Sequence, residues 1–204
     1  FDLVQVPKQG DDAMLLTVIC LFSRWCWIIP IEGKNSESIA EGLLTQVFGP
    51  FQIYPAVLRS DNASEFLGAV LGYVNSKLEI AHITGATYHP QAQGTVERLH
   101  RKINELIRAM FEDTPDSERG DWKQWIPFVV GHLRTLRMKV LGGRSPMEVV
   151  MGFQPQMPAT LRADLPVAAV SAGDYVKDLV RYLKDTHRRV HDRAKALQLE
   201  HEGQ

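Results

Sequence analysis

Cysteine is scarce in this chain, with only Cys20 and Cys26 among 204 residues. Two cysteines exclude a disulfide-rich scaffold and a zinc module of four cysteine ligands built from this chain alone. Both lie in a strongly apolar stretch, so we interpret them as small buried strand residues in a reducing compartment.

The chain also lacks a basic excess. It has 23 lysines and arginines against 24 acidic residues, a net charge of −1. No overall positive field therefore attracts nucleic acid, and any such binding needs a local patch. Hydrophobic residues make up 45% and charged residues 23%, which predicts a packed core and argues against intrinsic disorder.

No uninterrupted hydrophobic run is long enough to favour a membrane helix. The most apolar stretch, residues 14–31, contains Ser23-Arg24 in its middle and Pro30 near its end. It is rich in β-branched and aromatic residues, so we predict two buried strands joined by a tight turn, and no membrane association. Because the chain begins Phe1-Asp2-Leu3, we interpret it as a fragment of a longer protein.

Hydrophobic periodicity predicts a mixed α/β order of elements. Strands at residues 1–6, 14–21 and 25–31 would form an antiparallel meander. A helix between Asn35 and Gly49 follows. Strands at 56–59 and 79–84 then alternate with helices at 67–77 and 95–111. A helix at 122–138, a short helix opening at Ser145-Pro146 and an amphipathic tail helix complete the chain, with 161–171 as a connector.

Three acidic residues are notable for their positions. Asp2 lies in the first strand, and Asp61 lies just past the end of a later strand, where α/β sheets tend to place ligands. Glu97 lies in the first turn of the long predicted helix, and 35 residues separate it from Asp61. Taken alone, Asp61 is an ordinary turn or capping residue, and Glu97 an ordinary partner of the helix dipole.

The strings around these acids carry a resemblance. Arg59-Ser60-Asp61-Asn62-Ala63-Ser64-Glu65-Phe66 is followed by Tyr88-His89-Pro90-Gln91-Ala92-Gln93-Gly94-Thr95-Val96-Glu97-Arg98. Together they resemble the integrase catalytic core of retroviruses and gypsy-type long-terminal-repeat retrotransposons. Phe22-Ser23-Arg24-Trp25 and Ser145-Pro146-Met147-Glu148-Val149-Val150-Met151-Gly152 are similar to two further elements of that family. The resemblance covers residues 1–160, leaving 161–204 as a connector and C-terminal helix.

The resemblance implies a ribonuclease-H-like α/β fold, with a mixed five-stranded sheet flanked by helices. The first acid would sit mid-sheet, the second at a neighbouring strand's end, and the third on a helix packed across them. Asp2, Asp61 and Glu97 would then be catalytic and would bind two Mg²⁺ or Mn²⁺ ions, since clustered carboxylates repel one another until cations bind. The implied activity trims the 3′ ends of retroelement DNA and inserts them into target DNA.

The resemblance also implies residues that hold double-stranded DNA. Arg98, Arg101 and Lys102 share the helix of Glu97, and Asn62, His89 and Gln91 lie in the neighbouring strings. Such contacts position a phosphate backbone and carry little sequence information. The same basic row could equally be a solvated helix face. Relatives act as homo-oligomers on chromosomal DNA, so a homo-oligomer in the nucleus is expected.

Two rival functions remain open. The chain could be a host-captured, catalytically silent module that binds DNA or protein, although three intact acids argue against decay. It could also be a ribonuclease H that acts on RNA–DNA hybrids, although the His89-Pro90 loop and the Ser145-Pro146 element fit integrases better.

Overall fold

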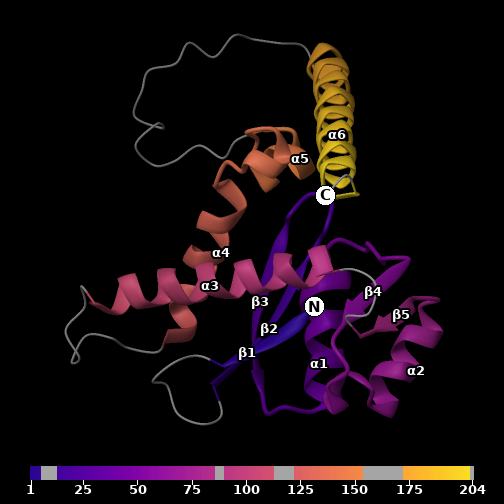
Figure 1. Ribbon diagram of the computed structural model, residues 1–204, viewed down its shortest axis with the longest axis vertical. Helices are drawn as coiled ribbons and strands as arrows, with labels where there is room; N and C mark the ends of the chain where they lie inside the picture. Colours follow the sequence, from indigo (N-terminus) through magenta and orange to yellow (C-terminus); the bar gives the residue numbers. More distant parts are fainter. Residues whose placement is uncertain (6–12, 86–89, 113–121, 154–171, 203–204) are drawn as a thin grey trace. The chain divides into compact units, whose positions relative to one another are not determined.

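The computed structural model describes residues 1–5, 13–85, 90–112, 122–153 and 172–202 (Figure 1). The chain divides into two compact units, each described by itself below. The first unit contains Phe1–Ile19 and Cys26–Val130, and the second contains Cys20–Trp25 and Gly131–Gln204. The predicted boundary near residue 160 lies outside the described residues and stays a prediction.

The first unit is built on an antiparallel meander. Strands β1 (Asp2–Gln5), β2 (Ala13–Ile19) and β3 (Cys26–Glu32) pair in that order, with Leu16 opposite Leu3 on one side and Ile29 on the other. The Cys20 amide bonds to the Trp25 carbonyl and the Arg24 amide to the Cys20 carbonyl, which closes the predicted turn between β2 and β3. The predicted meander is therefore confirmed.

A second, smaller sheet follows in the same unit. Strands β4 (Val57–Ser60) and β5 (Ala81–Thr84) pair in parallel, joined by the 3₁₀ turn Ser64–Phe66 (η2) and helix α2 (Ala69–Lys77). Parallel neighbours need such a crossover, and the alternation of strand and helix signals predicted it.

The resemblance implied a single five-stranded sheet, and this expectation is wrong for the described residues. The described strands form a three-stranded and a two-stranded sheet, and β1 is an edge strand, so Asp2 is not mid-sheet. In the described residues, the link recorded between β1 and β4 is one hydrogen bond, from the Phe1 amino group to the Arg59 carbonyl at 2.6 Å. One bond does not make a ladder, so the two sheets stay distinct.

Helix α1 (Ser36–Gly42) and the π-helical turn Leu43–Phe48 (η1) cover one face of the meander. Asn35 caps α1 as predicted, because its side chain accepts a hydrogen bond from the Ser38 amide at 2.8 Å. The core beneath includes buried side chains from both sheets and from these helices: Phe1, Leu16, Val18, Ile29, Ile31, Ile39, Leu43, Phe48, Leu58, Phe66, Leu71 and Ile80.

Helix α3 (Pro90–Glu112) carries Glu97 and belongs to the same unit. It begins five residues before the predicted start, so placing Glu97 in its first turn is wrong. Proline suits the first position of a helix, because its fixed φ is already helical and its missing N–H has no intrahelical partner there. Leu99, Ile103 and Ile107 are buried at three- and four-residue steps and define the packed side of α3.

One long helix predicted at residues 122–138 is instead two elements. A 3₁₀ turn (η4, Trp122–Trp125) leads into α4 (Ile126–Thr135), which ends before the 3₁₀ turn Lys139–Leu141 (η5).

The second unit is organised around the short helix α5 (Pro146–Met151). Ser145 and Glu148 form a complete capping box: the Glu148 amide donates to the Ser145 hydroxyl at 3.1 Å, and the Ser145 amide donates to Glu148 at 2.9 Å. Gly152 ends the helix with a φ of +81°. The string from Ser145 to Gly152 therefore forms a short helix with a capped start and a glycine at its end.

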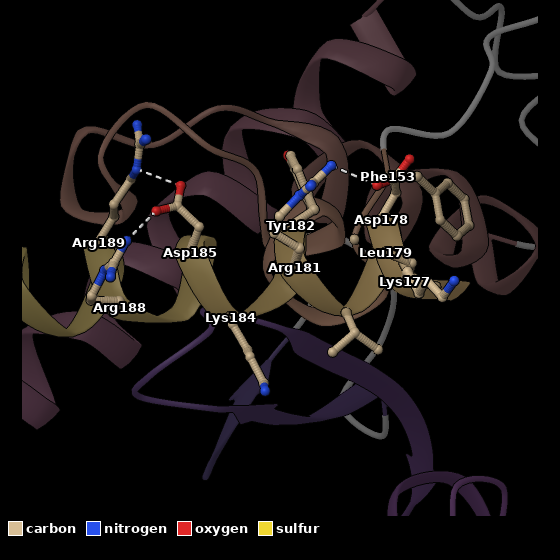
Figure 2. A pocket seen from close by; sticks show the side chains of 12 residues that line it. Phe153, Lys177, Asp178, Leu179, Arg181, Tyr182, Lys184, Asp185, Arg188 and Arg189 are labelled. Atoms are coloured by element: carbon tan, nitrogen blue, oxygen red, sulfur yellow. Dashed lines mark hydrogen bonds and ion pairs between the residues drawn. The ribbon is translucent and has the colours of Figure 1, made fainter. Parts of the chain in front are cut away.

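Helix α6 (Ala172–Glu202) packs against α5 and η5. Val190 is buried with Leu141 and Val149, and His187 hydrogen-bonds the Val149 carbonyl. Where α6 faces Gly152 and Phe153 the surface is hollowed, and Figure 2 shows Arg188 and Arg189 both reaching Asp185 there. The amphipathic tail helix is confirmed. Within the described residues, no helix is long and apolar enough to cross a bilayer.

Candidate active site

Asp2 opens strand β1 and lies opposite Thr17 of β2. Directly paired residues share a face of a sheet, so the side chains of Asp2 and Thr17 lie on the same side. The Leu3 amide donates to the Asp2 carboxylate at 2.8 Å, and the Thr17 hydroxyl donates to the Asp2 backbone carbonyl at 2.9 Å. Strand pairing and these two bonds fix Asp2 on the sheet.

Asp61 follows β4 directly and shapes the turn behind it. Its carboxylate accepts a hydrogen bond from the Ala63 amide at 3.0 Å, and its backbone carbonyl accepts one from the Ser60 hydroxyl at 2.8 Å. These bonds are typical of a residue at a strand end. The Phe1–Arg59 hydrogen bond brings the two acid-bearing segments together, because Asp2 is one residue from Phe1 and Asp61 is two residues from Arg59.

Helix α3 is tied to the same face of the sheet through His100. The His100 Nε2 atom lies 2.7 Å from the Thr17 hydroxyl oxygen. That hydroxyl donates its proton to Asp2, so it accepts from His100, whose Nε2 then carries the hydrogen. Glu97 precedes His100 by three residues and therefore lies one turn away on a neighbouring part of the helix surface. It is exposed, as is Asp61, whereas Asp2 is half-buried.

Electrostatic effects link Asp2 to Asp61 and both Asp2 and Glu97 to His100. Burial raises the pKa of Asp2, the Leu3 amide and His100 oppose this rise, and the negative charge of Asp61 adds to it. Burial lowers the pKa of His100, while the charges of Asp2 and Glu97 act in the opposite direction. Asp61 thus acts on Asp2, and His100 lies in the fields of both Asp2 and Glu97.

The described side chains do not form a ready coordination shell. Within that part of the chain, no group of three or more histidine, cysteine, aspartate or glutamate side chains is arranged to hold a metal ion. The donor chemistry nevertheless fits Mg²⁺ or Mn²⁺, which prefer carboxylate oxygen. Repulsion between Asp2 and Asp61 is the penalty that a bound cation would remove.

The predicted DNA contacts fall into three groups. Asn62 is exposed beside Asp61, and its amide lies next to Gly85 at the end of β5. Arg98, Arg101 and Lys102 are exposed on α3, away from its buried side. His89 lies outside the described residues, and the structure gives only the backbone of Gln91.

Two of the basic side chains on α3 have local partners. Arg98 donates to the Thr95 hydroxyl at 3.3 Å, and Lys102 pairs with Glu105 at 2.8 Å. An exposed pair of this kind contributes well under about 1 kcal/mol, so it leaves Lys102 available to a phosphate.

Sequence reasoning missed Lys34 and Glu65 as neighbours of the acids. The Lys34 ammonium lies 3.0 Å from the Glu65 carboxylate and within the fields of Asp61 and Asp2. Glu65 stands inside the string that carried the resemblance, four residues after Asp61. Nothing in the sequence marked Lys34, because the turn between β3 and α1 is distant in sequence from every acid of the site.

Comparison with known proteins shows which family the sequence resembles. Residues 1–90 match the family model described as "Integrase core domain". The chain is 31% identical over 165 residues to the Gag-Pol polyprotein of feline leukemia virus, covering 81% of this chain and 9% of that polyprotein. It is 27% identical over 157 residues to the retrovirus-related Pol polyprotein from transposon 412 of Drosophila melanogaster, covering 75% of this chain and 12% of that polyprotein.

The fold of the chain has a solved counterpart. The crystal structure of the catalytic core domain of BIV integrase aligns with a TM-score of 0.59 and 22% identity, covering 74% of this chain and 92% of that one. The mixed α/β fold resembling an integrase catalytic core is therefore confirmed. The chain spans about a tenth of the length of the curated polyproteins it matches.

Proposed function

We propose that this chain is the catalytic core of a polynucleotidyl transferase that trims retroelement DNA 3′ ends and inserts them into target DNA. The observation that supports this most strongly is the pairing of the Asp2 and Asp61 segments through the Phe1–Arg59 hydrogen bond, with Asp61 acting on the charge of Asp2. The Thr17–His100 contact holds the helix that carries Glu97 against β2. The homology to retroviral and transposon Pol polyproteins points to the same class of reaction.

Each acid has a distinct task in this proposal. Asp2, half-buried on the sheet, and Asp61, at the strand end, would hold divalent cations between them. Glu97 would complete the site from α3. Two bound ions would supply an activated oxygen nucleophile and stabilise the leaving 3′ oxygen. His100 would hold α3 against β2, and the exposed Arg98, Arg101 and Lys102 would grip phosphates on both sides of the scissile bond.

Substitutions of the acids test this function, because they should remove activity and leave the fold intact. Asp61→Asn and Glu97→Gln should abolish Mg²⁺-dependent trimming and joining of a DNA duplex with recessed or blunt ends. Their circular dichroism spectra should match that of the wild type. Glu41→Gln, which changes an exposed carboxylate on α1, is the matched control and should retain activity. Retained activity in the Asp61 or Glu97 variant would defeat the assignment.

A catalytically silent, host-captured module is the second candidate. The observation that favours it is the absence, among the described residues, of a preformed group of metal-binding side chains. A silent module would show no stabilisation by Mg²⁺ or Mn²⁺ and no cleavage of either a DNA duplex or an RNA–DNA hybrid. Cleavage of the hybrid alone would instead indicate a ribonuclease H.

The partners and place of action follow from the main proposal. Joining two DNA ends in concert needs more than one active site, so the working form would be a homo-oligomer on double-stranded DNA. Chromosomal target DNA would place the protein in the nucleus.

A further inference from the structure

A salt bridge connects two segments that flank the acid site. The Lys34 ammonium, in the turn after β3, lies 3.0 Å from the Glu65 carboxylate in η2. The two ends differ in exposure, since the Lys34 side chain is 59% exposed and that of Glu65 only 7%. A buried carboxylate whose charge is met by an exposed ammonium fixes that ammonium at the surface.

The location of Glu65 is itself set by packing beside the acids. Phe66, the next residue, is buried and meets the Phe1 ring edge-on at 4.8 Å between ring centroids. Phe1 precedes Asp2, and Glu65 follows Asp61 by four residues. The turn that starts at Asp61 therefore places Glu65 next to a residue that packs on Phe1, just before β1.

A close backbone approach holds the Lys34 side of the bridge. A Cβ atom on Gly68, the residue before α2, would collide with the side chain of Ser36, the first residue of α1, so the starts of α1 and α2 lie directly against each other. Asn35 and Ser38 cap the turn before α1. Lys34 thus has a fixed backbone at one end and a buried anion at the other.

Three carboxylates act on the charge of the Lys34 ammonium. Its pKa is raised, chiefly by the hydrogen bond and charge of Glu65 and further by the charges of Asp61 and Asp2. The ammonium is therefore charged at neutral pH and lies in the field of the carboxylates that would hold cations.

We propose that Glu65 positions the Lys34 ammonium beside Asp2 and Asp61, where it binds a phosphate of the nucleic acid and opposes divalent cations on those carboxylates. The proposal rests on the function proposed above and adds a binding residue, Lys34, and a positioning residue, Glu65. A lysine that only tied two loops together would change stability and neither affinity.

Lys34→Met tests both halves, because it keeps the length of the side chain and removes its charge. We expect about fivefold weaker binding of a short fluorescent DNA duplex, with the slope of log affinity against log salt reduced by about 1. We expect Mn²⁺ alone, titrated calorimetrically, to bind about fivefold more tightly, since a nearby positive charge is gone. Lys34→Arg should restore wild-type values in both measurements.

Lys77→Met is the matched control. Lys77 is also an exposed lysine of the first unit, but its ammonium lies over the Tyr73 ring on α2. Both affinities should stay at wild-type values in this variant.

Further variants separate position from charge and from folding. Glu65→Gln keeps the Lys34 charge but loosens its position, so DNA binding should weaken by about twofold. Because Lys34→Met leaves Glu65 buried and unpaired, the double variant Lys34→Met/Glu65→Gln guards against misfolding and should reproduce the Lys34→Met affinities.

Unchanged DNA affinity and salt slope in Lys34→Met, with or without a lower melting temperature, would overturn the proposal. So would weaker or unchanged Mn²⁺ binding. Failure of the proposed function gives a different result from failure of the Lys34 proposal. If the acids bind no cation, the wild type and Asp61→Asn respond identically to Mn²⁺. The DNA measurements still decide the phosphate contact in that case, and a wild type that binds no DNA overturns it.

Discussion

Glu148 of the second unit and the candidate acids of the first unit have opposite electrostatic surroundings. In the second unit, Glu148 is buried and completes the capping box, with Arg137 and Arg144 at 3.9 Å and the Tyr182 hydroxyl at 3.4 Å. In the first unit, within the described residues, no ion pair is recorded for Asp2, Asp61 or Glu97, and Asp61 instead adds to the rise in the pKa of Asp2.

This is the difference expected between an acid that stabilises the fold and the acids that we propose bind cations. Charge compensation by arginines and backbone amides stabilises a fold, and Glu148 has both. Acids placed in one another's fields cost stability, and they are typical of sites whose compensating charge arrives with a ligand. Glu97 and Glu148 both lie in sequence strings that carried the same resemblance. Only the surroundings of the two side chains distinguish them.

The largest expected effect is on the structural acid. Glu148→Ala removes the capping box and leaves two arginines without their anion, so we expect a loss of about 3 kcal/mol in unfolding free energy. Urea denaturation followed by circular dichroism measures it. Asp192→Ala, at an exposed acid of α6, should stay within about 0.5 kcal/mol of wild type. A cost below about 1 kcal/mol for Glu148→Ala would break the comparison.

Divalent cations should stabilise the folded state through Asp2 and Asp61, which we propose bind them, and not through Glu148. At a hundredfold excess over its dissociation constant, Mn²⁺ should raise the unfolding free energy by about 2.7 kcal/mol, because it binds the folded state alone. Asp61→Asn should lose this response, whereas a Glu148 variant should keep it. Thermal melts with and without Mn²⁺ provide the measurement, and an equal response in Asp61→Asn would contradict the contrast between the acids.

The end of α5 offers a test of packing in the second unit. A Cβ on Gly152 would lie 2.5 Å from the Leu179 Cδ1 atom, and the φ of +81° strains any other residue. Gly152→Ala should therefore cost about 2 kcal/mol. Gly143→Ala has the same φ of +81° with nothing within 4 Å, so it measures the strain alone, about 1 kcal/mol. Equal costs for the two variants would mean that α6 yields at Leu179.

The smallest effect concerns the pH dependence set by Asp2. Its folded pKa is raised above the ordinary 3.8, so the folded state holds the proton more tightly than the unfolded state. Ionisation therefore destabilises the fold as the pH rises above 3.8 through the raised value. Asp2→Asn should be slightly more stable than wild type at pH 7, and this advantage should vanish below pH 3.8. An advantage that grows on acidification would reverse the sign and refute the argument.

The features predictable from sequence were local ones. The Asn35 cap, the Ser145-Pro146 helix start and the Gly152 stop were all expected, because each depends on hydrogen bonds or dihedral preferences within a few residues. The antiparallel meander was expected for the same reason, since a tight turn joins β2 to β3.

The features that sequence reasoning missed depend on distant segments. The split into two sheets reflects how many hydrogen bonds β1 makes with β4, which lies more than fifty residues away in the chain. The early start of α3 placed Glu97 further along its helix than expected.

The sequence by itself determined the order of the elements, their caps and the candidate acids, because hydrophobic period and capping chemistry act over one or two turns. Only the tertiary structure decided which acid is paired and which is exposed to a like charge. It also decided that the charges of Asp2 and Asp61 act on Lys34, because electrostatic fields depend on distances that strand pairing and packing fix between remote parts of the chain.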